Sequence, residues 1–347
     1  MNETLNIEIA GKKIGQNEPA FVIAEIGVNH NGDIDLAHKL IDGALQSGAD
    51  AVKFQTIDAD ASYVPGTPSH DIFSKISFGL EEYESISNHC KEKGIVFFTT
   101  PGDWPSLEIC KKISVPAVKI SSGLMTNTPI VLAAARLGVP LVISTGGAYL
   151  WEIGKVVNQL EDINFKDFTL LHCVSIYPAD DDTLNLNAIS DMQKSFPYPI
   201  GYSDHSLGIT AVLSAVTLGA KVIEKHCTLS RELPGGDNFL SSEPDEFKKL
   251  IEQIRACENM LIGGTKKPHK KEMEFRERFR RRLVANRDIE KDEVLTDEVV
   301  GLMRPLEPYG LSPDFYQEII GKKASKKIFQ YDPITLDAIN FSDLSKE

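Results

Sequence analysis

Eight short apolar segments recur along the chain, and nearly all of them end in a polar residue. Stretches with apolar residues at helical spacing lie between them, so the repeating unit is one strand followed by one helix. This repeat predicts an α/β fold, the (β/α)8 or TIM barrel, whose parallel strands are buried on both faces. The segments are FVIAEIG (21–27), AVKFQT (51–56), IVFFTT (95–100), AVKISSG (117–123), LVISTG (141–146), TLLHCVS (169–175), PIGYSDH (199–205) and VIEKHC (222–227).

The polar residues that close these segments define a candidate site. In a (β/α)8 barrel the active site is built from the carboxyl ends of the strands, so we expect these side chains to converge at one end of the barrel. Buried strands with a purely structural role have no reason to end in this way eight times. The residues are Glu25, Lys53, Gln55, Thr100, Lys119, Ser122, Ser144, Ser175, Ser203, His205, Glu224 and His226.

The chain of 347 residues is longer than one barrel and predicts a second, smaller domain. We expect the barrel over residues 1–265, with a hairpin-like lead-in over 1–20. The basic stretch 266–282 is interpreted as a solvated linker, with nucleic-acid binding as the alternative. Short β segments over 283–347 predict a compact β-rich module, in which a loop carries Arg304.

Charge and cysteine content limit the possible partners and compartment. The formal net charge of −13 argues against a non-specific grip on nucleic acid or on an anionic membrane. There is no signal peptide pattern and no run of about 20 apolar residues, so we expect a cytoplasmic protein without a membrane span. The five cysteines are scattered without CxxC spacing, and Cys173 and Cys227, inside predicted strands, are expected to be small core residues.

His205 and His226 close neighbouring strands, and Glu224 shares a strand face with His226. Two imidazoles at adjacent strand ends predict a shared divalent metal ion with open positions for water and substrate. Ligation by nitrogen and oxygen without thiolate favours Mn²⁺ or a similar octahedral ion over structural zinc. The alternative is that each histidine caps its strand and bonds a loop.

Lys53 and Lys119 close two further strands, and a lysine within an apolar segment needs an anionic partner. Together with Ser122, Ser144 and Ser203 they predict a site for a small ligand that carries both phosphate and carboxylate. The alternatives are salt bridges to Glu25 or Glu224, or a lysine that forms a Schiff base. The sequence NHNGD (29–33) predicts a turn, which could also shape a lid over the site.

Eight motifs occur in order along the barrel region: EIGVNHNGD, AVKFQT, TTP, VKISSG, ISTGG, LHCVSIYP, GYSDH and IEKHCTL. With these motifs the chain resembles the sialic acid synthases, that is, N-acetylneuraminate synthase and its legionaminate and pseudaminate relatives. The resemblance covers essentially the whole chain, and residues 283–347 resemble the antifreeze-like (SAF, β-clip) domain of these enzymes.

The resemblance implies a transferase that condenses phosphoenolpyruvate with an N-acylmannosamine-type aldose, giving a nine-carbon 2-keto acid and phosphate. N-acetylneuraminate synthase is the first candidate. Alternatives are a legionaminate or pseudaminate synthase acting on a 2,4-diacetamido-trideoxyhexose, or a related synthase of shorter keto-sugar acids. A non-catalytic carbohydrate- or ice-binding protein built around the C-terminal module is the alternative from another class.

The resemblance also assigns roles to residues of this chain. His205 and His226 would bind the metal, with Mn²⁺ as the first candidate and Mg²⁺ or Co²⁺ as alternatives, and Glu25 and Glu224 would act in catalysis. The small domain would cap the barrel of a neighbour in a domain-swapped homodimer, so that Arg304 reaches the partner's sugar. The other expected sugar contacts are Gln55, Tyr177, Glu224 and Asp237, and the expected phosphoenolpyruvate contacts are Lys53, Thr100, Lys119, Ser122, Ser144, Ser175 and Ser203.

Overall fold

The computed structural model describes residues 5–341. The chain forms two compact units, Met1–Ile262 and Gly263–Glu347, so the boundary falls at a Gly-Gly pair. The stretch 266–282 contains a helix, α11 (Lys270–Phe279), which the structure describes in full and in which no residue is buried.

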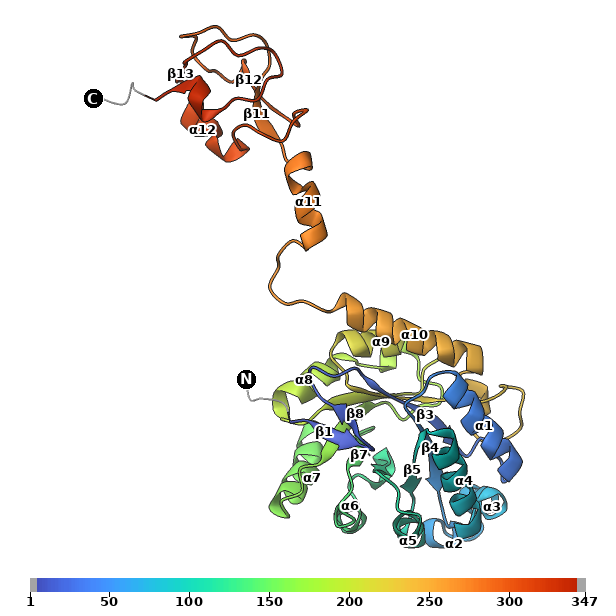
Figure 1. Ribbon diagram of the computed structural model, residues 1–347. Helices are drawn as coiled ribbons and strands as arrows, with labels where there is room; N and C mark the ends of the chain where they lie inside the picture. Colours follow the sequence, from blue (N-terminus) through green and yellow to red (C-terminus); the bar gives the residue numbers. More distant parts are fainter. Residues whose placement is uncertain (1–4, 342–347) are drawn as a thin grey trace. The chain divides into compact units, whose positions relative to one another are not determined.

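The first unit is a closed barrel of eight parallel strands, which confirms the predicted fold (Figure 1). The strands follow one another in chain order around the barrel, and the last pairs with the first, with His226 opposite Glu25. Each strand corresponds to one predicted segment. They are β3 (Phe21–Gly27), β4 (Ala51–Thr56), β5 (Val96–Pro101), β6 (Val118–Ile120), β7 (Leu141–Ser144), β8 (Phe168–Cys173), β9 (Ile200–Asp204) and β10 (Val222–His226).

A β-bulge in β3 shapes the mouth of the barrel. The register of β3 against β4 shifts between Glu25 and Gly27. Gly27 has a φ of 55°, a left-handed conformation that glycine adopts readily. A Cβ at Gly27 would lie 3.1 Å from Glu25 Oε1 and 3.3 Å from Gln55 Nε2, so glycine here lets the Glu25 carboxylate pack close to β4.

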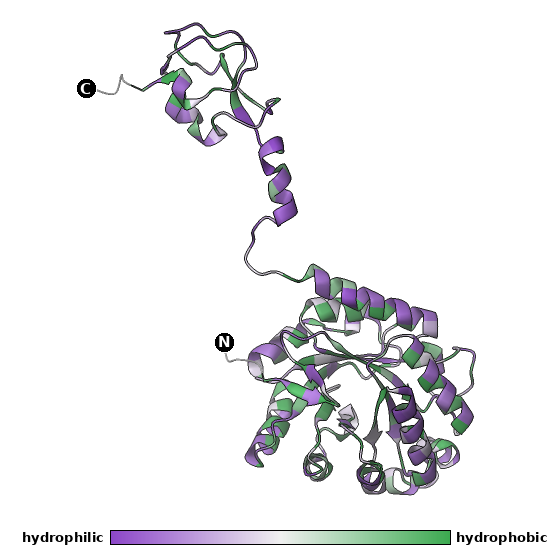
Figure 2. Cartoon of the chain, in the orientation of Figure 1, coloured by the Kyte–Doolittle hydropathy of each residue, from purple (hydrophilic) through white to green (hydrophobic). Residues whose placement is uncertain are grey.

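Helices surround the barrel (Figure 1) and carry hydrophobic as well as hydrophilic residues along their length (Figure 2). In α1, for example, Ala37, Leu40, Ile41 and Ala44 are buried. No helix among residues 5–341 is both long and apolar enough to cross a membrane. The helices of this unit are α1 (Ile34–Gln46), α2 (Ala59–Ser62), α3 (Pro68–Ile76), α4 (Leu80–Lys93), α5 (Trp104–Lys112), α6 (Thr128–Ala135), α7 (Leu150–Asp162), α8 (Asn187–Ser195), α9 (Thr210–Thr217) and α10 (Pro244–Met260).

A hairpin of β1 (Ile7–Ile9) and β2 (Lys12–Ile14) packs at the amino ends of the barrel strands. Lys12 Nζ lies 2.7 Å from Asp50 Oδ1, just before β4. Ile7, Ile9 and Ile14 are buried in the same core as the strands. The hairpin therefore covers the end of the barrel opposite to the candidate site.

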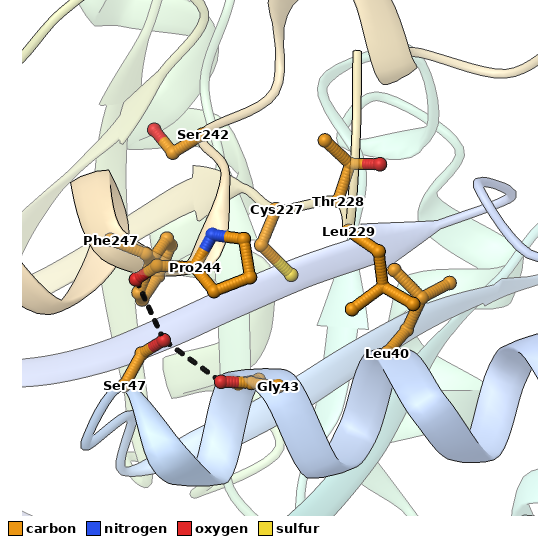
Figure 3. A pocket seen from close by; sticks show the side chains of 10 residues that line it. Leu40, Gly43, Ser47, Cys227, Thr228, Leu229, Ser242, Pro244 and Phe247 are labelled. Atoms are coloured by element: carbon orange, nitrogen blue, oxygen red, sulfur yellow. Dashed lines mark hydrogen bonds between the residues drawn. The ribbon is translucent and has the colours of Figure 1, made fainter. Parts of the chain in front are cut away.

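A small pocket lies between α1 and the segment that follows β10 (Figure 3). Ser47 Oγ donates hydrogen bonds to Gly43 O at 2.8 Å and to Pro244 O at 3.0 Å, which joins the end of α1 to the start of α10. Cys227 lines this pocket and belongs to the hydrophobic core, as expected from the sequence.

The second unit has its own hydrophobic core, which includes Leu283, Leu295, Ile319 and Ile334. Its strands are short and pair antiparallel, β11 (Arg282–Ala285) with β12 (Val300–Met303) and β13 (Lys323–Ala324) with β14 (Ile339–Asn340). Besides α11 it contains the short helix α12 (Tyr316–Ile319).

His30, in the turn after β3, makes the stability of the barrel depend on pH. Its ring is 1% exposed and stacks on Phe78 with centroids 4.0 Å apart, and Gly32 N donates to its Nδ1 at 3.1 Å. Burial lowers the pKa of His30 to about 4. The unfolded chain binds this proton near pH 6.5 and the folded chain near pH 4, so stability falls as the pH drops through that window.

We expect His30→Asn to lose this part of the pH dependence, because asparagine retains an acceptor for Gly32 and does not titrate. Urea unfolding of the wild type should give a free energy lower at pH 5 than at pH 7, with about 2 kcal/mol of the difference from His30. All other residues are the same in both proteins, so the comparison isolates His30. Equal pH dependence in the two proteins would contradict the assignment.

Candidate active site

Four charged side chains meet inside the mouth of the barrel and are each at most 7% exposed: Glu25, Lys53, Lys119 and Glu224. Lys53 Nζ lies 2.5 Å from Glu25 Oε2 and 3.9 Å from Glu224 Oε1, and it donates to Thr100 Oγ1 at 2.8 Å. Lys119 Nζ lies 3.8 Å from Glu224 Oε1. The salt bridges considered as an alternative for these lysines are therefore present, and they place two amino groups beside two carboxyl groups at the strand ends.

The pKa values of the two carboxyl groups move in opposite directions. Burial raises the pKa of Glu25, and Lys53 offsets only part of this rise. Burial by itself would raise the pKa of Glu224 as well. Its pKa is nevertheless lowered, because the effect of burial is outweighed by Lys119, by Lys53 and by the hydrogen bond that Ser203 Oγ donates at 3.0 Å. Such a pair suits a division of labour, in which Glu25 exchanges protons and Glu224 stays anionic.

His205 follows β9 and His226 ends β10, and their ring centroids are 5.4 Å apart. His205 Nδ1 donates to Val174 O at 2.7 Å, which fixes the ring and leaves Nε2 for another partner. His226 Nδ1 is buried without a hydrogen-bond partner. Burial, followed by the positive charge of nearby side chains, lowers the pKa of His226 well below its ordinary value, so the ring is neutral at pH 7.

This arrangement fits a divalent metal ion held by two protein ligands. A buried imidazole nitrogen without a partner is costly unless a ligand takes it up. Asp237 Oδ2 lies 3.8 Å from His226 Nδ1. Within residues 5–341, however, no three His, Cys, Asp or Glu side chains are grouped so that they could hold a metal by themselves. An ion here would keep several positions for water and substrate, as a catalytic ion does.

Three of the predicted serines lie around the loop after β7. Ser122 Oγ accepts a hydrogen bond from Gly146 N at 2.9 Å, and a Cβ at Gly146 would overlap Ser175 Oγ. Ser144 Oγ is buried without a hydrogen-bond partner. Glycine at 146 leaves room for a ligand close to the backbone, and the hydroxyl groups supply donors of the kind that bind phosphate.

The predicted sugar contacts are found at the same mouth, with one exception. The Tyr177 ring lies 4.1 Å from the His205 ring, centroid to centroid, and Gln55 Nε2 donates to Glu25 Oε1 at 3.1 Å. Asp237 lies in the loop after β10, beside His226. Arg304 belongs to the second unit, where it is exposed and its Nε donates to the carbonyl of Arg278.

Cys173 is buried, as we expected of a small core residue, but it also borders the site. Its Sγ lies 3.8 Å from His205 Nδ1, and a Cβ at Gly146 would lie 3.2 Å from it. The thiol therefore lines the site between the histidine and the serines. Side chains alternate along a strand, so the position of Cys173 two residues before Ser175 was the signal that could have identified it.

Asn29 is a second residue whose role the sequence did not reveal. The predicted turn at 29–33 is present, with Asp33 N donating to His30 O at 2.8 Å. Asn29 is also buried, and its Nδ2 donates to Cys227 O at 2.9 Å while its Oδ1 accepts from Asp237 N at 2.8 Å. This amide anchors the loop that carries Asp237 to the ends of β3 and β10.

Comparison with known proteins agrees with the fold and the motifs. The model of the NeuB family matches residues 40–267, more than half of the chain. The chain belongs to the NeuB family. A SAF domain matches residues 280–340 of this NeuB-family protein, which confirms the predicted C-terminal module.

Relatives match this NeuB-family chain over most of its length. An uncharacterized protein of Methanocaldococcus jannaschii is 38% identical over 334 residues, 95% of this chain and 99% of the relative. An N,N'-diacetyllegionaminic acid synthase of Campylobacter jejuni is 38% identical over 321 residues, 88% of this chain and 96% of the relative. The crystal structure of an N-acetylneuraminic acid (sialic acid) synthetase of Leptospira borgpetersenii, in complex with citrate, is 37% identical with a TM-score of 0.76, covering 80% of this chain and 97% of that one. The named relatives are synthases, so the chain is an enzyme.

Proposed function

We propose that this NeuB-family protein condenses phosphoenolpyruvate with an N-acylated mannosamine-type aldose, giving a nine-carbon 2-keto acid and phosphate. The supporting observation is the convergence of two lysines and two histidines on one barrel mouth. Lys53 and Lys119 lie within 4 Å of Glu224, which shares a strand face with His226. The lysines would bind the phosphorylated carboxylate, and a metal ion on the two imidazoles beside them would bind the carbonyl acceptor.

Phosphoenolpyruvate would bind across the lysines and the serines. Its carboxylate would contact Lys53, Lys119 and Thr100, which already forms a hydrogen bond with Lys53. Burial raises the pKa of Glu25, and a proton bound there would remove one of the two negative charges that oppose an anionic substrate. The phosphate would take its hydrogen bonds from the hydroxyl groups of Ser122, Ser144, Ser175 and Ser203.

The sugar would lie on the histidine side of the mouth. A divalent ion bound by His205 and His226, with Mn²⁺ as the first candidate and Mg²⁺ or Co²⁺ as alternatives, would supply Lewis-acid polarisation of the sugar aldehyde. Tyr177, whose ring packs at a tilt against that of His205, would form one wall of the sugar site. The other sugar contacts would be Gln55, Glu224 and Asp237.

The reaction then follows from the placement of the two carboxyl groups. C3 of phosphoenolpyruvate attacks the aldehyde carbon, and positive charge develops at C2 while the aldehyde oxygen becomes an alkoxide. Glu224 orients this oxygen as it takes up a proton from solvent. Glu25, in its ionised form, accepts a proton from the water that adds to C2 and later returns it to solvent. The adduct then breaks its C2–O bond: the new C2 hydroxyl passes its proton to the departing phosphate as the C2 carbonyl forms. Lys53 and Lys119 hold the negative charges in place throughout.

A panel of acceptor sugars tests this proposal through phosphate release from phosphoenolpyruvate. N-acetylmannosamine, its 6-phosphate and 2,4-diacetamido-trideoxyhexoses are the candidates, with erythrose 4-phosphate and arabinose 5-phosphate as controls for shorter keto-sugar acids. We expect release with an N-acylated sugar in the presence of Mn²⁺. Release with a control aldose alone would assign the protein to the shorter-chain synthases. A failure to bind phosphoenolpyruvate in calorimetry would favour the non-catalytic alternative.

Among the acceptors, N-acetylmannosamine is the first candidate, which would make the product N-acetylneuraminate. A 2,4-diacetamido-trideoxyhexose is the second candidate, because one relative at 38% identity is named an N,N'-diacetyllegionaminic acid synthase. The ratio of kcat/KM for the two sugars decides between them.

We also propose a domain-swapped homodimer in a reducing, cytoplasmic compartment. Large apolar side chains are exposed on the loops that follow the barrel strands and on the first turns of the helices after them, where a partner subunit could cover them; these are Trp104, Tyr149, Trp151, Leu207 and Phe239. All five cysteines are free thiols, which suits a reducing compartment.

In such a dimer, Arg304 would reach the sugar bound by the partner. Arg304→Ala is therefore expected to raise KM for the sugar by about tenfold to 100-fold, the effect of losing a charged hydrogen bond, with little change in KM for phosphoenolpyruvate. Arg287→Ala, another exposed arginine of the second unit, is the matched control. An equal rise in KM for the sugar and for phosphoenolpyruvate would contradict a role of Arg304 at the sugar.

A further inference from the structure

A buried ion pair lies in the wall of the barrel, directly behind the two histidines. Lys225 Nζ is 2.5 Å from Asp204 Oδ2, and the side chains are 2% and 0% exposed. Asp204 immediately precedes His205, and Lys225 immediately precedes His226. Because successive side chains of a strand point to opposite faces, the pair lies on the outer face of the wall and takes no part in the site itself.

The ion pair also forms hydrogen bonds with the backbone of Ser206, the residue that follows His205. Asp204 Oδ1 accepts hydrogen bonds from Ser206 N at 3.0 Å and from Ser206 Oγ at 2.7 Å. Lys225 Nζ donates to Ser206 O at 2.9 Å. Both backbone polar groups of Ser206 are therefore tied to the pair, so His205 is fixed between Asp204 and Ser206.

The same network reaches the loop that carries Tyr177. Ala179 N donates to His205 O at 3.0 Å, and Ala179 forms a parallel bridge with Ser206. The contacts thus run from β10 through Lys225 and Ser206 to the loop after β8. A shift of Ser206 would move both the His205 ring and the loop beside it.

A buried ion pair usually adds little net stability compared with apolar side chains of similar size, because desolvation offsets the attraction. We propose that Asp204 and Lys225 are positioning residues that set the distance and orientation of the His205 and His226 imidazoles. This inference rests on the proposed role of the two histidines as metal ligands. Outer residues that orient a ligand typically change metal affinity by about tenfold to 100-fold.

The test compares Lys225→Met, Asp204→Asn and the double variant with the wild type. Lys225→Met alone leaves the Asp204 carboxylate buried without its cation, so its urea midpoint should fall furthest, and the double variant should recover part of this loss. Thr169→Val is the matched control, because Thr169 Oγ1 donates to Pro199 O at 2.8 Å elsewhere in the buried wall.

Two readouts separate positioning from folding: amide hydrogen exchange at Ser206 and Ala179, and Mn²⁺ titration of the substrate-free protein by electron paramagnetic resonance. In the double variant we expect about tenfold faster exchange at both amides and a Kd for Mn²⁺ raised about tenfold to 100-fold, with phosphoenolpyruvate affinity unchanged. In Thr169→Val neither readout should change.

Unchanged exchange and unchanged Mn²⁺ affinity in the double variant would overturn the inference, as would equal effects in Thr169→Val. A wild type that binds no Mn²⁺, together with faster exchange in the double variant, would instead remove the proposed metal role of the histidines and leave the positioning of His205 supported. The two failures are therefore distinguishable.

Discussion

His226→Ala is expected to lose metal-stimulated turnover while it keeps the fold. The ring is buried at the end of β10, 5.4 Å from His205, and its Nδ1 has no protein hydrogen-bond partner. Removing the His226 ring breaks no hydrogen bond within the protein at Nδ1, but it leaves His205 as the one imidazole of the proposed metal site. We expect kcat/KM to fall by about three orders of magnitude, or ~4 kcal/mol, when phosphate release is measured with and without Mn²⁺.

His89→Ala is the control for this prediction. His89 lies on α4 outside the barrel, where its Nε2 is 3.0 Å from Asp42 Oδ1. This variant should keep its dependence on Mn²⁺, and circular dichroism should show folded protein in both cases. Turnover of His226→Ala at the wild-type rate would contradict the proposed role of the pair.

Lys53→Met is expected to affect both stability and activity. Lys53 lies between Glu25 and Glu224 and donates to Thr100, so its loss leaves two buried carboxylates with Lys119 as the remaining cation of the cluster. Such a change costs about 3–5 kcal/mol of unfolding free energy. We also expect KM for phosphoenolpyruvate to rise by at least about 100-fold, because a charged contact to its carboxylate is lost.

The double variant Lys53→Met with Glu25→Gln separates the two effects. It removes one positive and one negative charge together, so urea unfolding should show that much of the stability returns. Binding of phosphoenolpyruvate, measured by calorimetry, should stay weak. If the double variant binds phosphoenolpyruvate as tightly as the wild type does, then Lys53 pairs with Glu25 for stability and does not bind the substrate, which would contradict this prediction.

The barrel could be predicted from the sequence because each strand is a continuous apolar run followed by a polar residue, a pattern set by burial on both faces. The observed strands start within one residue of the predicted segments. The pattern could not predict where a strand stops early or how the segments between strands fold. The segment 117–123 is strand only over Val118–Ile120, because a 3-10 helix begins at Ser122, and the region 57–80 folds into α2 and α3.

The site was predictable to the extent that strand ends converge, and its supporting residues were not. Lys53, Glu224 and the two histidines follow from their places on the strands. Cys173 reaches the site because of its strand face, and Asn29 and the Asp204–Lys225 pair act through contacts between segments about 20 to 200 residues apart. Such contacts depend on tertiary structure, and the repeat of strands and helices along the sequence does not show which distant segments meet.

The most direct test follows the oxygen atom that joins C2 and phosphorus in phosphoenolpyruvate. With this oxygen labelled as ¹⁸O and with an accepted N-acylated sugar, we expect one equivalent of labelled phosphate for each unlabelled nine-carbon 2-keto acid by mass spectrometry. Label retained in the keto acid would contradict addition of water at C2, and phosphate release without a nine-carbon product would contradict the condensation itself.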